Sequence, residues 1–234
     1  LTEVGQAFYE RCVQLLADLE ESEAAVRSQA VVPKGTLRLT CGVTFGEHYL
    51  APAIAEFAAR HPQLVFDVDL SDRAVDLVEE GFDLAVRIGP VGSPALVARR
   101  LAYTQLVCCA SPAYLARHAP PATPDDLPQH ACFAYTYAPP ASAWTFEARD
   151  GTRHTPRIDF RHRANNGRLL AAIAIAGLGI TLEQDFIVAE AVRSGQLLRV
   201  LPDYQPPRTP ISAVYPSRRH LSAKVRAFVD FLAR

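Results

Sequence analysis

The fold of this chain is set by residues 36–70, which read TLRLTCGVTFGEHYLAPAIAEFAARHPQLVFDVDL. The first seven residues alternate between apolar and polar side chains, as a half-buried strand does. An apolar stripe at helical spacing follows and stops at His61-Pro62, and Leu64–Leu70 then alternate again. A strand, a helix and a strand of these lengths predict a βαβ unit in a mainly parallel sheet.

The same pattern continues on both sides of a middle stretch, residues 119–142, that is rich in Pro and Ala. Before it, we expect a short helix capped by Ser71-Asp72 and strands over 82–88 and 106–110. Beyond it, we expect a hairpin of 144–147 with 157–161, then further strands and helices up to residue 232. Two α/β clusters predict two lobes and a small-molecule cleft, because such folds bind ligands at strand ends or between lobes.

Residues 1–30 differ from the rest of the chain. Their apolar residues recur in steps of three and four with polar residues between them, which predicts a long amphipathic helix. A coiled-coil partner is the natural cover for such a stripe, and a helix packed along its own domain is the alternative. The stripe consists of Val4, Phe8, Cys12, Leu15, Leu19 and Val26.

Composition excludes several classes of protein. The chain carries 24 basic and 25 acidic residues, so it lacks the basic excess expected of a part that binds DNA phosphates. Five scattered cysteines argue against a disulfide framework and fit a reducing cytosol. The sequence contains neither a signal peptide nor an apolar run long enough for a membrane helix. Because it also contains no Met, we expect it to be a piece of a longer chain.

Signals of catalysis are absent from the sequence. It has no Gly-x-Ser-x-Gly, no His-Glu-x-x-His and no P-loop, and Gly177-Leu-Gly179 follows a helix rather than a strand. The seven histidines lack the spacing of metal ligands, and Cys108-Cys109 lie in an apolar strand where packing is favoured over redox sensing. We therefore expect no enzyme activity, no cofactor and no metal.

Seven stretches stand out, in this order: LTEVGQAFYERC (1–12), GTLRLT (35–40), LAPAIAEFAARHP (50–62), EEGFDLAVRIG (79–89), CCASPAYL (108–115), AGLGI (176–180) and RHLSAKVRAFVDFL (219–232). Each is weak alone, but their order spans the whole chain. Together they resemble LysR-type transcriptional regulators, with closest similarity to the CrgA-like and AaeR-like subgroup.

The resemblance implies a fold of two Rossmann-like lobes, similar to type 2 periplasmic-binding proteins, joined by two crossover strands and preceded by a linker helix. It implies a dimerisation helix over 1–32, a first lobe over 34–110 and 208–234, and a second lobe over 111–207. It also implies a cytoplasmic homodimer or homotetramer whose small-molecule effector, an organic acid by our expectation, binds in the interlobe cleft. Promoter DNA would be bound by an N-terminal winged helix-turn-helix that this sequence lacks.

Four candidate effector-binding residues fall in the first lobe. Thr44 lies at the start of a helix, where free N–H groups and the dipole favour a carboxylate, although a plain N-cap is the alternative. Phe45 could face the cleft or pack. Arg87 and Ile88 end a strand, and Arg87 could hold an anionic effector or form an internal salt bridge with Asp83.

Six more candidates fall in the second lobe. Asn166 and Gly167 begin a helix and mirror Thr44, and the adjacent Arg168 is a cation where only a nearby anion would favour one. The tyrosines could supply hydroxyl groups or a stacking face, or they could be core residues. Leu182 and Gln184 are candidates by their family position alone. The six candidates of the second lobe are thus Tyr135, Tyr137, Asn166, Gly167, Leu182 and Gln184.

Two rival functions share this architecture. A periplasmic-type solute-binding protein would need export and no dimerising helix, so the first thirty residues and the lack of disulfides argue against it. An enzyme on the same fold would need a convergent catalytic set, which the sequence does not supply. The identity of the effector, the promoter and the direction of regulation stay open.

Overall fold

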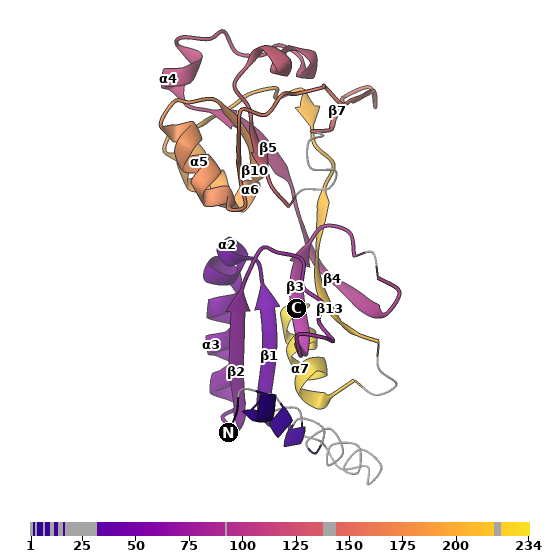
Figure 1. The fold of residues 1–234 in the computed structure, drawn as a ribbon. Coiled ribbons are helices and arrows are strands. Elements are labelled where there is room, and N and C mark those ends of the chain that lie inside the picture. Colours follow the sequence, from indigo (N-terminus) through magenta and orange to yellow (C-terminus); the bar gives the residue numbers. More distant parts are fainter. Residues whose placement is uncertain are drawn as a thin grey trace. The chain divides into compact units, whose positions relative to one another are not determined.

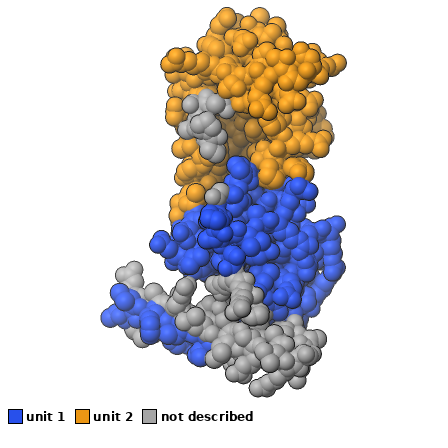
Figure 2. Space-filling view, turned by 90° about the vertical axis from the view of Figure 1, so that its right-hand side faces the viewer, with its two compact units in different colours: residues 1–71, 75–102, 211–234 blue, residues 72–74, 103–210 orange. Residues whose placement is uncertain are grey.

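The computed structural model describes residues 2, 4–6, 8–9, 12–13, 16, 32–91, 93–137, 144–217 and 221–234. The chain forms two compact units, coloured separately in Figure 2. Unit 1 contains residues 1–71, 75–102 and 211–234, and unit 2 contains residues 72–74 and 103–210. The chain therefore passes from one unit to the other near residue 102 and again near residue 210.

Unit 1 is built on one five-stranded sheet with strand order β2-β1-β3-β13-β4 (Figure 1). β1 runs parallel to β2 and β3, with Leu37 opposite Phe66 and Leu39 opposite Leu84. β13 runs antiparallel to β3. The strands are β1 (Gly35–Cys41), β2 (Leu64–Leu70), β3 (Leu84–Ile88), β4 (Leu96–Thr104) and β13 (Thr209–Pro216).

Helices of unit 1 cover one face of this sheet. The segment after β1 is a continuous helix made of α2 (Val43–Phe45), a π-helical turn (Gly46–Leu50) and α3 (Ala51–Arg60). It ends at His61, as the following proline predicted. α7 (Ala223–Leu232) is capped by Ser222, whose hydroxyl accepts a hydrogen bond from Val225 N. The π-helical turn was not expected from the sequence.

The core of unit 1 is aromatic where α3, β2 and α7 meet. The Phe228 ring lies 5.1 Å from the Phe57 ring and 5.1 Å from the Phe66 ring, in edge-on geometries. Phe57 and Phe228 are almost completely buried, together with the inward side chains of β1 and β3. Such aromatic contacts add to the free energy gained by burial alone.

A buried ion pair ties α7 to the sheet. Lys224 Nζ lies 2.9 Å from Asp83 Oδ2 and donates a 2.6 Å hydrogen bond to the Thr36 carbonyl. Arg38 N donates to the same Asp83 oxygen at 3.0 Å. Only 7% of the Lys224 side chain and 10% of the Asp83 side chain are exposed, so water screens this pair little.

One expected helix is wrong. Residues 71–81, expected to form a helix capped by Ser71-Asp72, contain no helix: 71–76 are irregular and 77–81 form turns. The physical reason is Asp76, whose side chain accepts hydrogen bonds from Val78 N at 2.9 Å and Glu79 N at 3.0 Å. An Asp side chain that binds backbone N–H groups in this way favours a turn over a helix interior.

Unit 2 contains a three-stranded sheet and a parallel strand pair beside it. β5 (Leu106–Ala110) lies between β10 (Ile180–Gln184) and β11 (Leu198–Arg199) and is antiparallel to both. β6 (Phe133–Tyr135) and β9 (His162–Ala164) pair in parallel, and a single bridge joins Cys132 to Ile180. β5 thus lies in unit 2.

The expected hairpin of residues 144–147 with 157–161 is wrong, because a small outer sheet of unit 2 pairs the first of these segments differently. β7 (Phe146–Ala148) pairs with β8 (Arg153–His154) around the Asp150-Gly151 turn and with β12 (Tyr204–Gln205) on its other side. The expected partner, residues 157–161, is not a strand, although Ile158 and Phe160 alternate into the core. Their rings and methyl groups pack with Trp144, which is 7% exposed.

Four helical segments complete unit 2. α4 (Pro112–Leu115) is capped by Ser111, and a 3₁₀ segment (Pro124–Gln129) begins with a Thr123–Asp126 capping box. α5 (Gly167–Ile175) and α6 (Asp185–Arg193) cover the β5–β10 face. Leu170, Ala174 and Val188 bury their side chains there.

The expected helix over residues 1–30 lies mostly outside the described residues, and so do Leu15, Leu19 and Val26 of its apolar stripe. The described residues between Val4 and Leu16 are helical. Val4 is 80% exposed and Phe8 is 71% exposed in the single chain.

Candidate functional site

The helix start in unit 1 follows β1 directly, at the carboxyl end of the parallel strands. Gly42, not Thr44, occupies the N-cap position, and no side chain caps this helix end. Thr44 lies in the first turn and is 6% exposed. The alternative interpretation of Thr44 as a plain N-cap is therefore wrong, because the helix begins two residues earlier than that interpretation requires.

Arg87 joins the carboxyl ends of three strands of unit 1. It extends from β3 and donates to Thr40 Oγ1 on β1 at 3.1 Å and to the Ser71 carbonyl after β2 at 3.3 Å. The alternative of an internal bridge to Asp83 does not match the observed pair, which Asp83 makes with Lys224. The guanidinium group of Arg87 therefore lies at the same edge as the helix start.

Two hydrophobic candidates in unit 1 contribute to packing. The Phe45 ring stacks on Tyr49 with 5.0 Å between centroids, and Phe45 packs against the main core of the unit. Ile88 is partly buried against the same core and pairs with Ile211 on β13. Both side chains therefore have a structural role whether or not a ligand reaches them.

In unit 2, the carboxyl ends of β6 and β9 lie at one edge because these strands are parallel. Tyr135 ends β6, and its ring meets Tyr137 edge-on with 6.0 Å between centroids. Asn166 follows β9 and caps α5, where its Oδ1 accepts a 3.0 Å hydrogen bond from Leu169 N. The structure thus brings both tyrosines and the α5 start to one edge of unit 2.

Gly167 is buried and packs against an acidic side chain. A Cβ atom on Gly167 would lie 2.5 Å from Glu183 Oε2 and 2.7 Å from Ile187 Cδ1, so any side chain there would displace the ends of these two side chains. Glu183 lies on β10, is 4% exposed and was missed by the sequence analysis. Burial raises its pKa to about 8 and the nearby Asp72 charge adds to this, against a hydrogen bond from the Thr181 hydroxyl that lowers it.

The remaining candidates lie on the same strand as Glu183. Leu182 is 8% exposed, and its side chain belongs to a hydrophobic core of unit 2. Gln184 Oε1 lies 3.0 Å from the Thr104 hydroxyl, which also lies 2.6 Å from Asp185 Oδ1 at the start of α6. Gln184 therefore has a hydrogen-bonding role within unit 2, and Leu182 has a packing role.

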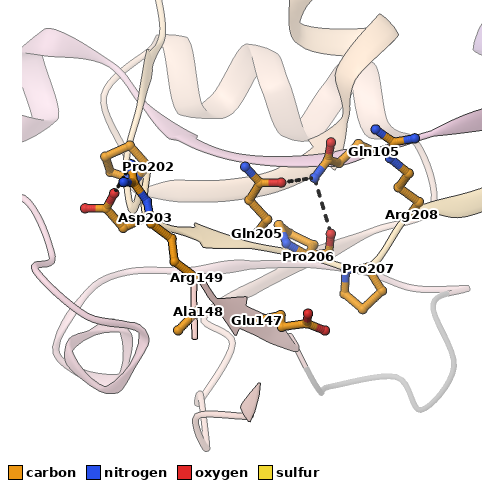
Figure 3. A pocket seen from close by; sticks show the side chains of 10 residues that line it. All are labelled: Gln105, Glu147, Ala148, Arg149, Pro202, Asp203, Gln205, Pro206, Pro207 and Arg208. Carbon is orange, nitrogen blue, oxygen red and sulfur yellow. Dashed lines mark hydrogen bonds and ion pairs between the residues drawn. The ribbon is translucent and has the colours of Figure 1, made fainter. Parts of the chain in front are cut away.

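A separate hollow of about 580 Å³ lies within unit 2 and contains none of the ten candidate residues (Figure 3). Gln105 Nε2 donates to Gln205 Oε1 at 3.2 Å and to the Pro206 carbonyl at 3.4 Å along its wall. An exposed Arg149–Asp203 ion pair lines another side. It is a polar surface hollow formed by β7 and the segments that connect unit 2 to unit 1.

The candidates therefore fall into two groups, one at the helix start of each unit. Each unit brings its own group together at a strand edge. The expected interlobe cleft stays a prediction. Within the described ranges, no three His, Cys, Asp or Glu side chains cluster as metal ligands, and no helix is long and apolar enough to cross a membrane.

Comparison with known proteins gives consistent matches. Residues 31–234 match the LysR substrate binding domain family. The chain is 36% identical over 233 residues to the Escherichia coli HTH-type transcriptional regulator DmlR, covering 99% of this chain and 75% of that protein. It is 30% identical over 233 residues to the regulator CrgA of Neisseria meningitidis serogroup C, covering 99% and 77% respectively.

Solved structures agree with these matches. The CrgA regulatory domain of Neisseria meningitidis has a TM-score of 0.74 at 29% identity, covering 86% of this chain and 98% of that one. Full-length AphB, a Vibrio cholerae virulence activator, has a TM-score of 0.75 at 27% identity, covering 99% and 79%. The expected α/β fold class, that of type 2 periplasmic-binding-protein-like regulatory domains, is confirmed.

Proposed function

The chain belongs to the LysR family of transcriptional regulators, and we propose that it senses a small anionic effector and self-associates. The family match over residues 31–234 carries the first part, because it covers an effector-binding domain of a DNA-binding regulator. The relatives are transcriptional regulators and not enzymes. The negative charge of the effector is inferred from the two helix starts and Arg87, and self-association is inferred from the exposed apolar residues within 1–32.

The effector is an organic acid bound at the helix starts of α2 and α5. Unpaired N–H groups and the helix dipole favour an anion at such positions. In unit 1 the support comes from Arg87, whose guanidinium group lies at the strand edge beside α2 and can form a bidentate pair with a carboxylate. In unit 2 it comes from Tyr135, Tyr137 and Asn166 around the start of α5.

Six further candidates belong to this proposal. Thr44 would contribute its first-turn backbone N–H, and Gly167 would allow close approach to the backbone of α5. Phe45, Ile88, Leu182 and Gln184 would shape the surroundings of the acid by packing and by hydrogen bonding. The lobe boundaries expected from the sequence are part of the same proposal.

Self-association is proposed to run through residues 1–32. The helical residues Val4, Phe8, Tyr9, Val13 and Leu16 all expose large apolar side chains in the single chain. A helix that exposes a row of such side chains gains free energy when a second helix covers it. The homodimer or homotetramer would bind promoter DNA through a winged helix-turn-helix outside this sequence, in the cytoplasm.

A thermal-shift screen of aromatic and aliphatic acids tests the effector proposal. We expect one or more acids to raise the melting temperature of the wild type, and Arg87→Ala or Asn166→Ala to reduce that rise. Glu147→Gln, which lines the separate hollow in unit 2, is the matched control and should respond as the wild type does. Equal stabilisation of the wild type and Arg87→Ala would contradict the proposed site.

Solution mass tests the self-association proposal. We expect a dimer or tetramer whose mass per particle falls when residues 1–30 are deleted. A particle that is monomeric with and without these residues would contradict it.

A further inference from the structure

Glu183 is a buried acidic side chain that makes no ion pair with any residue the structure describes. It lies on β10 with Thr181 two residues before it, so both side chains point to the face that α5 and α6 cover. Glu183 is 4% exposed, and acidic side chains are seldom buried to this extent unless they are paired. In the part of the chain that the structure describes, the single hydrogen bond to its carboxyl group is the 3.2 Å bond from Thr181 Oγ1 to Oε1.

The second carboxyl oxygen, Oε2, lies directly beneath the first residue of α5. It is 2.5 Å from the position of a Cβ atom on Gly167, and the carboxyl carbon is 3.3 Å from that position. Only a glycine lets the helix backbone approach the carboxyl group this closely. Glu183 therefore contacts the helix end that we propose for the effector carboxylate.

Charged and titratable groups surround Glu183 unevenly. Asp72 raises the pKa of Glu183, and Glu183 in turn raises the pKa of Cys109 on the neighbouring strand β5. Arg199 on β11 lowers the pKa of Cys109. The other charged residues of the neighbouring helices are Asp185, which begins α6, and Arg168, which is exposed in the first turn of α5. Because burial is the largest cause and raises the pKa to about 8, Glu183 is mostly neutral at pH 7.

We propose that Glu183 is a specificity-determining residue of the effector site, which admits a carboxylate at the α5 start only while Glu183 is protonated. The neutral acid leaves the helix end to the effector. The ionised acid places its own negative charge at that helix end and repels a second carboxylate. Two carboxylates at one site cannot both stay ionised without a counter-ion, because their repulsion is strong in a poorly hydrated environment. This inference rests on the proposed function.

The size of the effect follows from the protonated fraction. With a pKa of about 8, the neutral form makes up about 0.9 of the protein at pH 7 and about 0.1 at pH 9. If only the neutral form admits the anion, the apparent Kd rises about tenfold between these two pH values. By reciprocity, a bound carboxylate must raise the pH at which Glu183 loses its proton.

The first experiment measures binding of benzoate and oxalate by calorimetry from about pH 6 to about pH 9, where both stay ionised. We expect the affinity of the wild type to fall about tenfold above pH 7 and that of Glu183→Gln to stay level. The Gln side chain has the same shape and cannot ionise. An equally steep fall in both proteins overturns the inference.

The second experiment needs no variant, so it stands even if Glu183→Gln folds poorly. Carbon-13 NMR follows the Glu carboxyl groups of the wild type through a pH titration, with and without benzoate. We expect one carboxyl group to titrate with a midpoint near pH 8, and benzoate to shift that midpoint upward. A midpoint that benzoate does not move overturns the inference.

The two proposals fail in different ways. If acids stabilise the protein through Arg87 and Asn166 while the Glu183 midpoint stays unmoved, only the role of Glu183 fails. If no acid stabilises the wild type and benzoate leaves the midpoint unmoved, the anionic effector site fails and the role of Glu183 fails with it.

Discussion

Among the described residues, unit 1 buries the side chain of Asp83 and unit 2 buries that of Glu183, and the two are held in opposite ways. In unit 1, Asp83 receives Lys224 Nζ at 2.9 Å and the Arg38 N–H at 3.0 Å, so a cation and an amide compensate its charge. In unit 2, Glu183 receives one hydroxyl group and no cation among the described residues. Desolvation acts on both carboxyl groups, but only Asp83 has a counter-ion.

The difference separates a structural acid from a responsive one. The Asp83–Lys224 pair joins α7 to β1 and β3, so it serves the packing of unit 1. Glu183 makes no ion pair with the described residues, and its protonation state can change within an ordinary range of pH. A buried acidic side chain without a counter-ion is therefore a candidate for sensing pH or a bound anion.

The largest effect is expected from breaking the pair in unit 1. Lys224→Met should lower the free energy of unfolding by about 3–5 kcal/mol, because it leaves Asp83 buried without a cation. Urea unfolding followed by circular dichroism measures this. The double variant Lys224→Met/Asp83→Leu removes both charges and should recover most of the loss, and a loss equal to that of the single variant would contradict this account.

A smaller effect is expected from titrating the acid in unit 2. The pKa of Glu183 is about 8 in the folded chain against 4.5 as its ordinary value, so the folded protein binds more protons between these values. The free energy of unfolding should therefore fall as pH rises through this window, by about 2–4 kcal/mol, and change no further above pH 8 from this group.

Glu183→Gln isolates this contribution. The variant should lose less stability than the wild type between about pH 5 and about pH 8, and it should be the more stable protein at the upper end. Urea titrations at several pH values measure the difference. Parallel curves for the two proteins would show that Glu183 does not titrate in this window.

The contact between Gly167 and Glu183 predicts a third, smaller effect. Ala normally stabilises a helix relative to Gly by up to about 1 kcal/mol, but a Cβ atom here would lie 2.5 Å from Glu183 Oε2. Gly167→Ala should therefore destabilise the protein by about 1–3 kcal/mol. In a Glu183→Ala background the same change should cost clearly less, as a thermal unfolding cycle of the four proteins would show.

The smallest effects concern the two helix starts. Asn166→Ala should cost about 1 kcal/mol, because Asn166 Oδ1 caps Leu169 N, and Asn166→Asp should keep most of that stability. Gly42 caps α2 without a side chain, so Gly42→Ser should gain a few tenths of a kcal/mol. Denaturation midpoints compare the three variants, and a loss from Gly42→Ser would indicate that this helix end tolerates no side chain.

Strong periodicity made part of the fold predictable from the sequence. β2 and β5 have the bounds expected from their apolar patterns, and α3 ends at His61 because Pro62 follows. β4 was missed because most of its nine residues are exposed, which leaves no alternation to detect. The helix expected after Ser71 failed because Asp76 uses its side chain to form a turn.

The candidate site was predictable only in outline. Asn166 and Arg87 could be placed at a helix start and at a strand end from local sequence signals alone. Glu183 could not be recognised, since a Glu that alternates with apolar residues in a strand usually faces water. Its burial depends on α5 and α6, which fold over β10 from elsewhere in the chain.

The packing of Trp144 gives the molecule a built-in optical label. Trp144 is the one tryptophan of the chain and lies in the core of unit 2 against Phe146 and Phe160. Tryptophan fluorescence therefore comes from unit 2 alone, and unit 1 contributes none. A red shift of the Trp144 emission on heating would report the unfolding of unit 2. Comparing its midpoint with that of the ellipticity of the whole chain would show which unit unfolds first.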